Sequence, residues 1–558
     1  MRWFGGCAPG GPARVPVGVR LVWSDPLLWT AGSWPERLVK SVESPSGFRL
    51  AVFGPCSAGP DVLAQAAKAP DLARAVAGWA GCFTAVRVDP SGTVEVVTDL
   101  AAALPLYSVR TVDGLVWGSS ALALSALTGG QTDSEWVRSF LLDRQAPLPA
   151  RSAWAGVLPV PAGSRLRLGP GGAVSVTAWW SPSRRSYEAA VPLVAKALGE
   201  GVRARVEGVA VSSDVAGIDS TTVAVLAARH GPVLGLTAHP EGITDGGDLR
   251  YARALTVPQL EHLPFPLRRE HLPFSPAGRA LPATDEPAPS SGLWAMFSEH
   301  LLTVAWRGSV CHLTGDGGDN LFMAPPVHLA DLARLGRFWR LGRDALAWSQ
   351  LRRESPWPLV GAALTGSVAR LYRPWLAKPP WLTGPADEPP PTPGDADTVL
   401  VADLRGAARA AVADAQLAAS VGVELHNPYF DGLLLDAVVS VPAWHRFSVR
   451  RYKPLLVDAM GTLLPEAHRT RAAKGVFAGD FHRGVRANLP ALLALADGRL
   501  AGLGLIDPGP LRAALHGVAL GAKSVWPPLL AALAAEMWMA AVESDKPVAW
   551  VPAGEVQR

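Results

Sequence analysis

The chain has 558 residues, a formal net charge of +4 and a mean hydropathy of +0.18. This length is too great for one ordinary hydrophobic core and predicts at least two domains. No basic run or aromatic-basic stripe accompanies the small net charge, which argues against nucleic-acid binding. No apolar run reaches the roughly 20 residues of a membrane span, and the N-terminus lacks a signal-peptide pattern. We therefore expect a soluble, cytoplasmic protein.

The cysteines and lysines are few. Cys7, Cys56, Cys82 and Cys311 lie far apart and have no metal-ligand spacing, so we expect reduced thiols rather than a disulfide framework. Only eight of the 52 basic residues are lysines. A lysine inside a motif therefore needs a specific explanation.

The chain divides by pattern near residue 180. Residues 1–180 alternate short β-type runs, such as Val15–Trp23 and Ser164–Leu168, with Gly/Pro turns, which predicts a mostly β, two-layered domain. A Ser-Pro-Ser-Arg-Arg-Ser stretch then marks the expected boundary with a second domain, residues 181–558. There, strands expected at 207–213, 233–238 and 309–313 alternate with helices expected at 220–230 and 245–256. This alternation predicts a doubly wound parallel sheet with ligands at the carboxyl ends of its strands.

The remainder of the second domain is predicted to be helical. Val399–Ser420 is its longest amphipathic stretch, and Leu529–Val542, which contains Glu536, is predicted to be a packed helix. Proline density over residues 378–394 excludes helix and sheet and predicts an exposed loop. Gly517–Ser524 nearly spells a phosphate-binding Walker A loop, but Ala522 stands where glycine is required and the residues before it look helical, so we reject that reading.

The most informative stretch is residues 209–220, where an apolar strand runs into a tight turn that opens a helix. Such a turn directs backbone N–H groups and the positive end of the helix at one point, where a phosphate can bind. Asp219 lies beside that point, and a carboxylate is useful there only if a divalent cation bridges it to the phosphates. Alone, Asp219 would more often be a helix N-cap.

A second acidic turn, Leu313–Asn320, follows another apolar run and brings Asp316 and Asp319. Alone, Asp316 could equally be a turn residue that satisfies its own backbone. Two acidic, glycine-bearing turns at strand ends predict a single Mg-nucleotide site.

These turns resemble those of the asparagine synthetase family, ATP-pyrophosphatase enzymes that form amides. Val215–Ser220 matches the family's Ser-Gly-Gly-Leu/Ile-Asp-Ser, and Gly315–Phe322 matches its Gly-Glu-Gly-x-Asp-Glu-Leu-Phe. Segments that match in the family's order are Gly78–Phe83, Asp99, Pro105–Tyr107, Trp117–Ser119, Thr284–Pro287, Glu424–Asp431 (with His426 in place of arginine), Tyr452–Leu456, Leu464–Pro465 and Arg471–Phe477. The resemblance implies an N-terminal Ntn-hydrolase-like αββα glutaminase domain and a C-terminal doubly wound parallel α/β ATP-pyrophosphatase domain with a helical extension.

One departure concerns the source of ammonia. The family's glutaminase uses a cysteine exposed at the mature N-terminus, whereas Arg2 stands at position 2 here and Cys7 would serve only after removal of six residues. Without that nucleophile, glutamine cannot supply ammonia through an acyl-enzyme. We expect the first domain to be a degenerate, structural remnant, with the amine supplied by the substrate.

A second departure concerns the phosphate turn. Val215 replaces the phosphate-binding serine and Ala216 replaces a glycine. Backbone N–H groups can still bind pyrophosphate, although a missing hydroxyl costs about 1.5–3 kcal/mol. Ser212, Ser213 and Ser220 are the residues that could replace it.

The resemblance is strongest to the lasso peptide cyclases, through the Ser-Ser-Asp before the first turn and the Gly-Asp-Gly-Gly-Asp of the second. It implies ATP-dependent macrolactam formation: adenylation of an Asp or Glu side chain of a core peptide, then attack by that peptide's N-terminal amine. The implied partners are a ribosomal precursor peptide, a leader-binding protein and a leader peptidase. Two alternatives remain: another glutamine-independent amide ligase, of β-lactam synthetase or ammonia-dependent type, and a catalytically silent binding scaffold.

The same resemblance suggests residue roles. Asp219 and Asp319 would hold Mg²⁺ on ATP, and Lys474, helped by Lys453, would neutralise the α-phosphate and the later oxyanion. Asp316 is the first choice for the general base and Glu286 the second. The expected ATP contacts are Ser212, Ser213, Val215, Ala216, Gly217, Ile218, Asp219, Ser220, Leu236, Thr237, Thr314 and Gly315.

Overall fold

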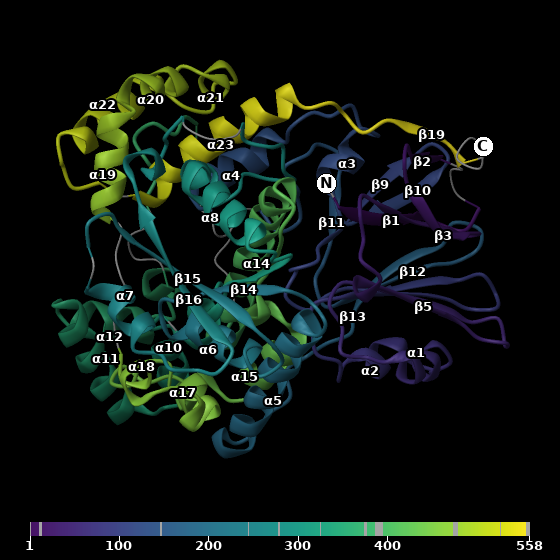
Figure 1. Ribbon diagram of the computed structural model, residues 1–558, viewed down its shortest axis with the longest axis horizontal. Helices are drawn as coiled ribbons and strands as arrows, with labels where there is room; N and C mark the ends of the chain where they lie inside the picture. Colours follow the sequence, from purple (N-terminus) through teal and green to yellow (C-terminus); the bar gives the residue numbers. More distant parts are fainter. Residues whose placement is uncertain are drawn as a thin grey trace.

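A computed structural model describes residues 2–10, 14–144, 148–243, 245–276, 280–323, 325–372, 377–384, 394–471, 478–524 and 526–553. It is a mixed α/β structure with a sheet-rich N-terminal region and a parallel sheet further along the chain, as the sequence predicts. Figure 1 shows the N-terminal sheets on the right and the parallel sheet among helices on the left. No helix in the described ranges is long and apolar enough to cross a membrane.

The N-terminal region contains two six-stranded antiparallel sheets. Its strands are β1 (Trp3–Cys7), β2 (Arg14–Pro16), β3 (Arg20–Ser24), β4 (Leu27–Ala31), β5 (Val39–Glu43), β6 (Arg49–Phe53), β7 (Thr84–Val88), β8 (Val94–Val97), β9 (Leu106–Thr111), β10 (Gly114–Gly118), β11 (Leu158–Val160), β12 (Ser164–Leu168) and β13 (Val174–Ala178). One sheet has the order β11-β9-β10-β1-β4-β3 and the other β13-β12-β8-β7-β6-β5. The expected single strand Val15–Trp23 is in fact two, β2 and β3, because the chain turns at Gly18 with φ +76°.

Apolar side chains join the two N-terminal sheets face to face. Phe4 of β1 stacks on Phe53 of β6 with ring centroids 4.1 Å apart, and both rings are fully buried. Helices α1 (Pro60–Ala67) and α2 (Leu72–Val76) share a core cluster with the β6 sheet, whereas α3 (Ala121–Ser125) and α4 (Ser134–Leu142) share one with the β1 sheet.

The second sheet system is fully parallel, with the order β16-β15-β14-β17-β18. Its strands are β14 (Val211–Asp214), β15 (Val233–Pro240), β16 (Leu260–Leu267), β17 (Cys311–Leu313) and β18 (Glu424–His426), and its helices include α5 (Tyr187–Val206), α6 (Ile218–Ala227), α7 (Gly247–Arg253) and α8 (Trp294–Trp306). The chain builds outward from β14 in one direction and then from β17 in the other. The strand order therefore reverses between β14 and β17, where ligands bind in open α/β sheets.

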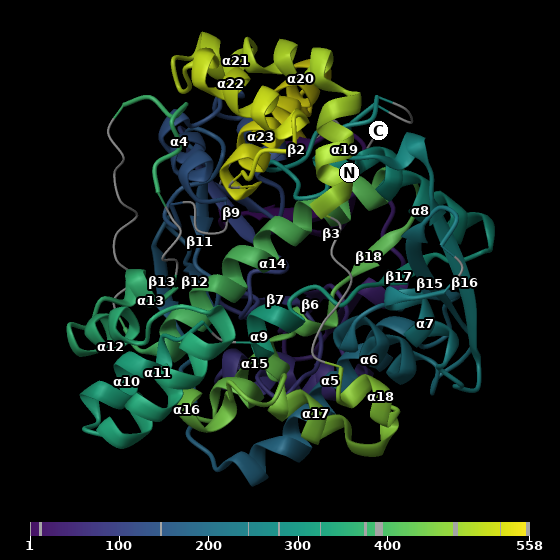
Figure 2. The same ribbon diagram turned by 90° about the vertical axis from the view of Figure 1, so that its left-hand side faces the viewer.

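The C-terminal half is helical, as expected (Figure 2). Its helices are α9 (Gly318–Phe322), α10 (His328–Arg334), α11 (Phe338–Arg352), α12 (Trp357–Leu364), α13 (Val368–Tyr372), α14 (Ala396–Ser420), α15 (Gly432–Val439), α16 (Ala443–Arg446), α17 (Pro454–Met460), α18 (Glu466–Arg469), α19 (Ala478–Ala487), α20 (Leu489–Ala496), α21 (Arg499–Gly502), α22 (Pro508–Ala519) and α23 (Trp526–Ser544). Helix α14 is the predicted long helix, α23 is the predicted packed helix, and α22 confirms that a helix precedes the Walker-like segment. Of the proline-rich loop, residues 385–393 lie outside the described residues.

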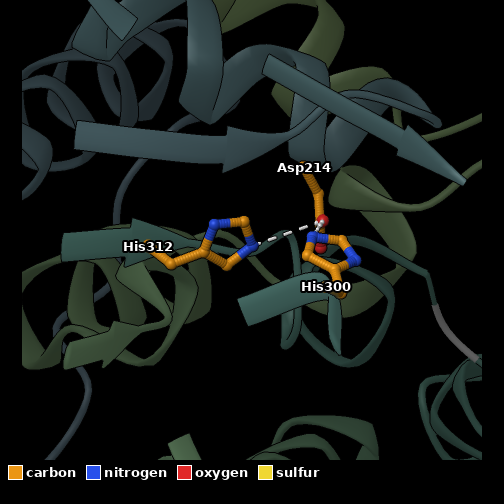
Figure 3. Close-up of side chains that lie close together, drawn as sticks. All are labelled: Asp214, His300 and His312. Atoms are coloured by element: carbon orange, nitrogen blue, oxygen red, sulfur yellow. Dashed lines mark ion pairs between the residues drawn. The ribbon is translucent and has the colours of Figure 1, made fainter. Parts of the chain in front are cut away.

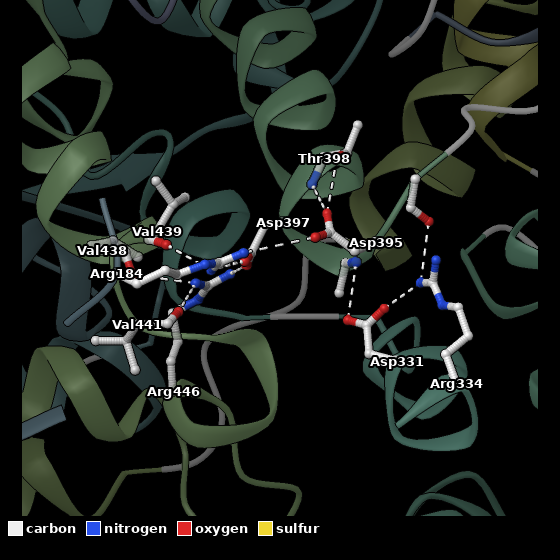
Figure 4. Close-up of polar contacts among 12 residues, drawn as sticks. Arg184, Asp331, Arg334, Asp395, Asp397, Thr398, Val438, Val439, Val441 and Arg446 are labelled. Atoms are coloured by element: carbon white, nitrogen blue, oxygen red, sulfur yellow. Dashed lines mark hydrogen bonds and ion pairs between the residues drawn. The ribbon is translucent and has the colours of Figure 1, made fainter. Parts of the chain in front are cut away.

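A partly buried polar network fixes the start of α14 (Figure 4). Asp395 is its N-cap, and Asp331 of α10 accepts a second hydrogen bond from the first turn at 3.1 Å. The buried guanidinium of Arg446 lies 2.5 Å from Asp397, and Arg184 lies 2.6 Å from the same carboxylate. Asp331, Arg184 and Arg446 thus tie the first turn of α14 to other parts of the chain.

The two halves of the chain are joined by pairing and by charge. Strand β19 (Trp550–Pro552) pairs with β2, and one core cluster contains both Trp29 and Trp538. Glu424 of β18 lies 3.2 Å from Arg2 and 2.6 Å from Arg37. These contacts stabilise the N-terminal sheets against the parallel sheet.

Candidate functional site

The first acidic turn connects β14 to α6. The N–H of Val215 donates to Leu236 O at 2.7 Å, and Thr237 Oγ1 donates to Val215 O, so β15 holds the start of the turn. Gly217 is the N-cap of α6, and no side chain caps that helix. The first amides of α6 thus point at the end of the sheet, which is the geometry that binds a phosphate. Leu236 and Thr237, which were expected to contact ATP, form hydrogen bonds with Val215 of this turn.

The three serines proposed to replace the missing hydroxyl differ in position. Ser220 Oγ accepts from the N–H of Ala216 at 3.2 Å and therefore lies against the phosphate turn. Ser212 Oγ instead lies 2.8 Å from His312 Nδ1, and Ser213 Oγ donates to Leu313 O at 3.2 Å. Ser212 and Ser213 thus direct their hydroxyls at β17, so Ser220 is the serine in contact with the turn.

The second acidic turn packs directly against the first. A Cβ added to Gly318 would lie 2.5 Å from Asp219 Cγ, and one added to Gly315 would lie 2.6 Å from the Ser220 N. No larger residue fits at either position without moving the turns apart. The close approach brings Asp319, in the first turn of α9, to the same place as Asp219.

Lys453 occupies the centre of this arrangement. Its ammonium contacts Asp219 Oδ2 and lies 2.6 Å from Asp319 Oδ1, and its side chain is fully buried. The Lys453 backbone is left-handed, with φ +44°, a conformation that costs about 1–3 kcal/mol in a non-glycine residue. Lys453 immediately precedes Pro454, the first residue of α17. The two carboxylates converge on the Lys453 ammonium, and the same oxygen donors are of the kind that Mg²⁺ prefers.

Other side chains support the two turns. Tyr429 donates to Asp219 O at 3.1 Å, and Thr314 Oγ1 donates to Asn427 at 2.7 Å. Arg471 donates to Ala216 O at 2.8 Å, and its guanidinium lies 4.1 Å from the centre of the Tyr251 ring. Lys474, the first choice for the essential lysine, lies outside the described residues. Arg471, which the sequence reading did not single out, therefore supplies a described cation behind the phosphate turn.

The two proposed bases lie in different environments. Asp316 is exposed at the tip of its turn, and its N–H donates to Thr314 Oγ1 at 3.1 Å. Glu286 is buried, which raises its pKa, and it lies 3.0 Å from Arg409 of α14. The ion pair to Arg409 uses the Glu286 carboxylate in packing and makes Asp316 the more accessible base.

A third acid was not found from the sequence. Burial raises the pKa of Asp414 on α14 to about 7, and the nearby Asp316 carboxylate adds to the increase. Asp414 accepts hydrogen bonds from Ser290 N at 2.9 Å and Ser290 Oγ at 3.0 Å. A carboxyl that titrates near neutral pH beside Asp316 is suited to accept a proton there. In the sequence, Asp414 is one of several acids on an amphipathic helix.

A cavity of about 540 Å³ opens beside the ends of β15 and β16. It is lined by residues that include Pro240, Leu267, His271, Met296 and Phe481. All five strands are parallel, so this cavity lies along the same edge of the sheet as the two acidic turns. Its volume suits a nucleoside-sized ligand or a short peptide segment.

The cysteines of the chain are all described and all buried. Burial raises the pKa of Cys7 to about 12 and of Cys56 to about 11, and it raises that of Cys82 well above its usual value. Burial also raises the pKa of Cys311 to about 12. These thiols stay protonated at neutral pH and are poor nucleophiles.

Comparison with known families decides the class. The family model described as "Asparagine synthase" matches residues 193–540. The chain belongs to the asparagine synthase family. That membership supports an ATP-dependent ligase that forms amide bonds, and Mg²⁺ is typical of the family. The asparagine synthase region spans both acidic turns and the Lys453 segment.

Other comparisons add little to this family assignment. No curated protein matches the chain. The solved structures that match include the allosteric regulatory enzyme of purine biosynthesis, at 11% identity and TM-score 0.22, covering 47% of this chain and 65% of that one. Glutamine phosphoribosylpyrophosphate amidotransferase from B. subtilis, complexed with ADP and GMP, matches at 11% identity and TM-score 0.22, covering 57% of this chain and 82% of that one. At these TM-scores, neither likeness supports an inference about fold or function.

Proposed function

We propose that this protein is a cytoplasmic macrolactam synthetase of lasso peptide biosynthesis, which uses ATP to join a side-chain carboxylate of a core peptide to that peptide's N-terminal amine. The observation that carries the proposal is the convergence of Asp219 and Asp319 on the Lys453 ammonium beside the uncapped N-terminus of α6. Phosphoryl chemistry on a nucleotide needs this combination of carboxylates and N–H donors. The peptide as substrate rests on the motif resemblance.

In the first half-reaction, the peptide carboxylate attacks the α-phosphorus of ATP. A new P–O bond forms, the bond to the bridging oxygen breaks, and pyrophosphate leaves. Asp219 and Asp319 would hold Mg²⁺, which neutralises charge on the phosphates. The α6 amides and Ser220 bind the phosphates, while Lys453 lies between the two carboxylates and Arg471 fixes the Ala216 carbonyl. Lys474 would add a further cation at the α-phosphate.

In the second half-reaction, the amine attacks the acyl carbon and AMP leaves. The attacking amine must lose a proton, which Asp316 accepts, with Asp414 beside it as the group whose raised pKa lets it share that proton. The cavity at the ends of β15 and β16 would hold the folded peptide and exclude water from the adenylate.

The buried thiols support an amine that comes from the substrate. Glutamine-derived ammonia requires an accessible thiolate, and each cysteine of this chain is buried with a raised pKa. A precursor peptide, a leader-binding protein and a leader peptidase are the partners that this function requires.

The proposal is tested by mass spectrometry and pyrophosphate release. The reaction contains the protein, ATP, Mg²⁺, leader-binding protein, peptidase and a candidate precursor. The core peptide should become lighter by one water, and ATP should release one pyrophosphate for each ring formed. An ammonium-dependent amide product without ring formation would instead favour a small-molecule amide ligase. Absence of ATP cleavage with peptide and small acids alike would favour a silent scaffold.

The variant that separates catalysis from scaffolding is Lys453→Met, with the exposed Lys196→Met as its control. We expect Lys453→Met to lower ring formation by at least about 100-fold, because it removes the charge between the carboxylates. Circular dichroism should establish that the variant is folded. Equal product from both variants would contradict the role of Lys453.

A further inference from the structure

A second group of possible ligands lies on the parallel sheet, apart from the magnesium carboxylates. Strands β14 and β17 pair with Ser212 opposite His312, and Asp214 is two residues further along the same face. His300 reaches this face from α8. Asp214 Oδ1 lies 3.4 Å from Nε2 of each histidine, and the ligating atoms of all three residues lie within 4.8 Å of one another (Figure 3).

The two contacts between the histidines and Asp214 are longer than well-formed hydrogen bonds. An N–H···O bond spans about 2.7–3.2 Å, so 3.4 Å is outside the usual range. His300 Nε2 is buried and has no hydrogen-bond partner within the described part of the chain. A tetrahedral ion with bonds of about 2.0–2.1 Å separates its ligand atoms by about 3.3–3.4 Å. The separations to Asp214 match that shell.

A directed hydrogen-bond chain prepares His312 as a ligand. Ser309 Oγ donates to the carbonyl of Cys311 at 3.1 Å, and a carbonyl can only accept. Ser309 Oγ therefore accepts from Ser212 Oγ at 2.8 Å, and Ser212 Oγ accepts from Nδ1–H of His312 at 2.8 Å. This chain places a hydrogen on Nδ1, so the tautomer that it selects has its lone pair on Nε2, which faces the Asp214 carboxylate. A cation between Nε2 and the carboxylate, either a proton or a metal ion, satisfies both groups, and a metal ion also engages His300.

An aromatic ring covers one side of the Asp214, His300 and His312 cluster, and the other side is open to solvent. The Phe265 ring lies 5.4 Å from the His300 ring and closes one side. The Asp214 side chain is 34% exposed, which leaves a route for an ion and an open fourth position. Imidazole nitrogens with one carboxylate suit Zn²⁺ and similar ions, unlike the oxygen donors of Asp219 and Asp319.

We propose that Asp214, His300 and His312 bind one divalent transition metal of the Zn²⁺ class, with solvent in the fourth position. The bound ion joins β14, β17 and α8 at the strand end from which the phosphate turn begins. It therefore fixes the start of that turn without contacting the nucleotide. The site does not depend on which peptide or acid the enzyme uses.

The test is metal binding by the full-length protein. Purified protein stripped with a chelator should take up one equivalent of Zn²⁺ in calorimetry and keep it through dialysis into metal-free buffer, as measured by elemental analysis. His300→Gln and His312→Gln should each weaken binding by more than about 100-fold, and Ser212→Ala by about 10–100-fold, as loss of a supporting partner does. His271→Gln is the matched control, because His271 also stacks on Phe265 but pairs with Glu299 at 3.0 Å.

Two results would overturn the proposal: no saturable Zn²⁺ binding by the wild-type protein, or unchanged binding in the His300→Gln, His312→Gln double variant. If these variants do not fold, as judged by circular dichroism, Co²⁺ added to the wild-type protein decides. Intense visible bands of four-coordinate Co²⁺ support the site, and the weak spectrum of six-coordinate Co²⁺ contradicts it.

Discussion

The sheet-rich N-terminal half and the parallel sheet both contain buried titratable groups, but the groups at the two acidic turns are gathered around one ammonium. In the N-terminal half, burial raises the pKa of Cys7 to about 12 and of Asp99 to about 6, so each is pushed towards its neutral form. At the parallel sheet, Asp219 and Asp319 instead face the ammonium of Lys453. Burial raises the pKa of Asp99 in one half and of Asp414 in the other, whereas Asp219 and Asp319 lie against an ammonium whose charge opposes theirs, beside the phosphate turn.

Topology explains why the convergence occurs in one half. Antiparallel sheets place successive turns at opposite ends, so the turns of the two N-terminal sheets are dispersed. Parallel strands send every following turn to the same edge, and the order reversal between β14 and β17 opens a crevice there. The two acidic turns follow these two strands.

The largest expected effect tests the charged edge itself. Asp219→Asn and Asp319→Asn should each lower ATP-dependent pyrophosphate release by about 100–1000-fold, because each removes a charge that faces the phosphates. Asp61→Asn, on the exposed start of α1, is the control and should change the rate less than twofold. Rates within threefold of wild type for both site variants would exclude the proposed metal site.

The next prediction compares a buried ion pair that stabilises the fold with an exposed one. Arg205 and Asp431 form an ion pair whose side chains are 1% and 0% exposed, with Asp431 in the synthase half close to Cys82. Breaking this pair with Asp431→Asn should lower the free energy of unfolding by about 3–5 kcal/mol in urea denaturation. Asp497→Asn, which breaks the exposed pair with Arg512, should leave the urea midpoint close to that of the wild type because solvent screens this pair. Similar losses of stability in both variants would contradict a stabilising role for the buried Arg205–Asp431 pair.

A smaller effect concerns the pH dependence of stability. Since the folded-state pKa of Asp414 is raised to about 7, the folded protein holds a proton that the unfolded chain releases above about pH 4. This group therefore lowers the free energy of unfolding by about 1.4 kcal/mol per pH unit between about pH 4 and pH 7, and adds no further change above that window. Asp414→Asn should remove this slope from the difference between variant and wild type in urea denaturation across the range. An unchanged slope would show that Asp414 ionises normally.

The smallest effect is expected in the N-terminal half. Cys7→Ala should leave pyrophosphate release within twofold of wild type, because the Cys7 thiol is buried and protonated. A thiol reagent should react slowly with the native protein and with all four cysteines once urea unfolds it. If the wild-type protein hydrolyses glutamine and Cys7→Ala does not, the Cys7 thiol is reactive and the N-terminal half is catalytic.

Local patterns in the sequence predicted much of the fold. The strand at Ser164–Leu168 has the predicted bounds, and the amphipathic stretch at Val399–Ser420 is the longest described helix, α14. Strand β16 was missed because Pro264 and Pro266 interrupt it. Both prolines are tolerated because β16 is an edge strand, whose one partner among the described strands is β15. Whether a strand is central or at an edge depends on partners that the local pattern does not contain.

By itself, the sequence determined the glycine-bearing acidic turns at the ends of two strands, since turn residues and strand alternation are local properties. It also placed Asp219 and Asp319 in those turns. Only the tertiary structure decided that Lys453 lies between these carboxylates, that the charge of Asp316 acts on Asp414, and that Ser212 supports a histidine instead of a phosphate. Such contacts join residues about 100 or more positions apart, and only packing brings those residues together.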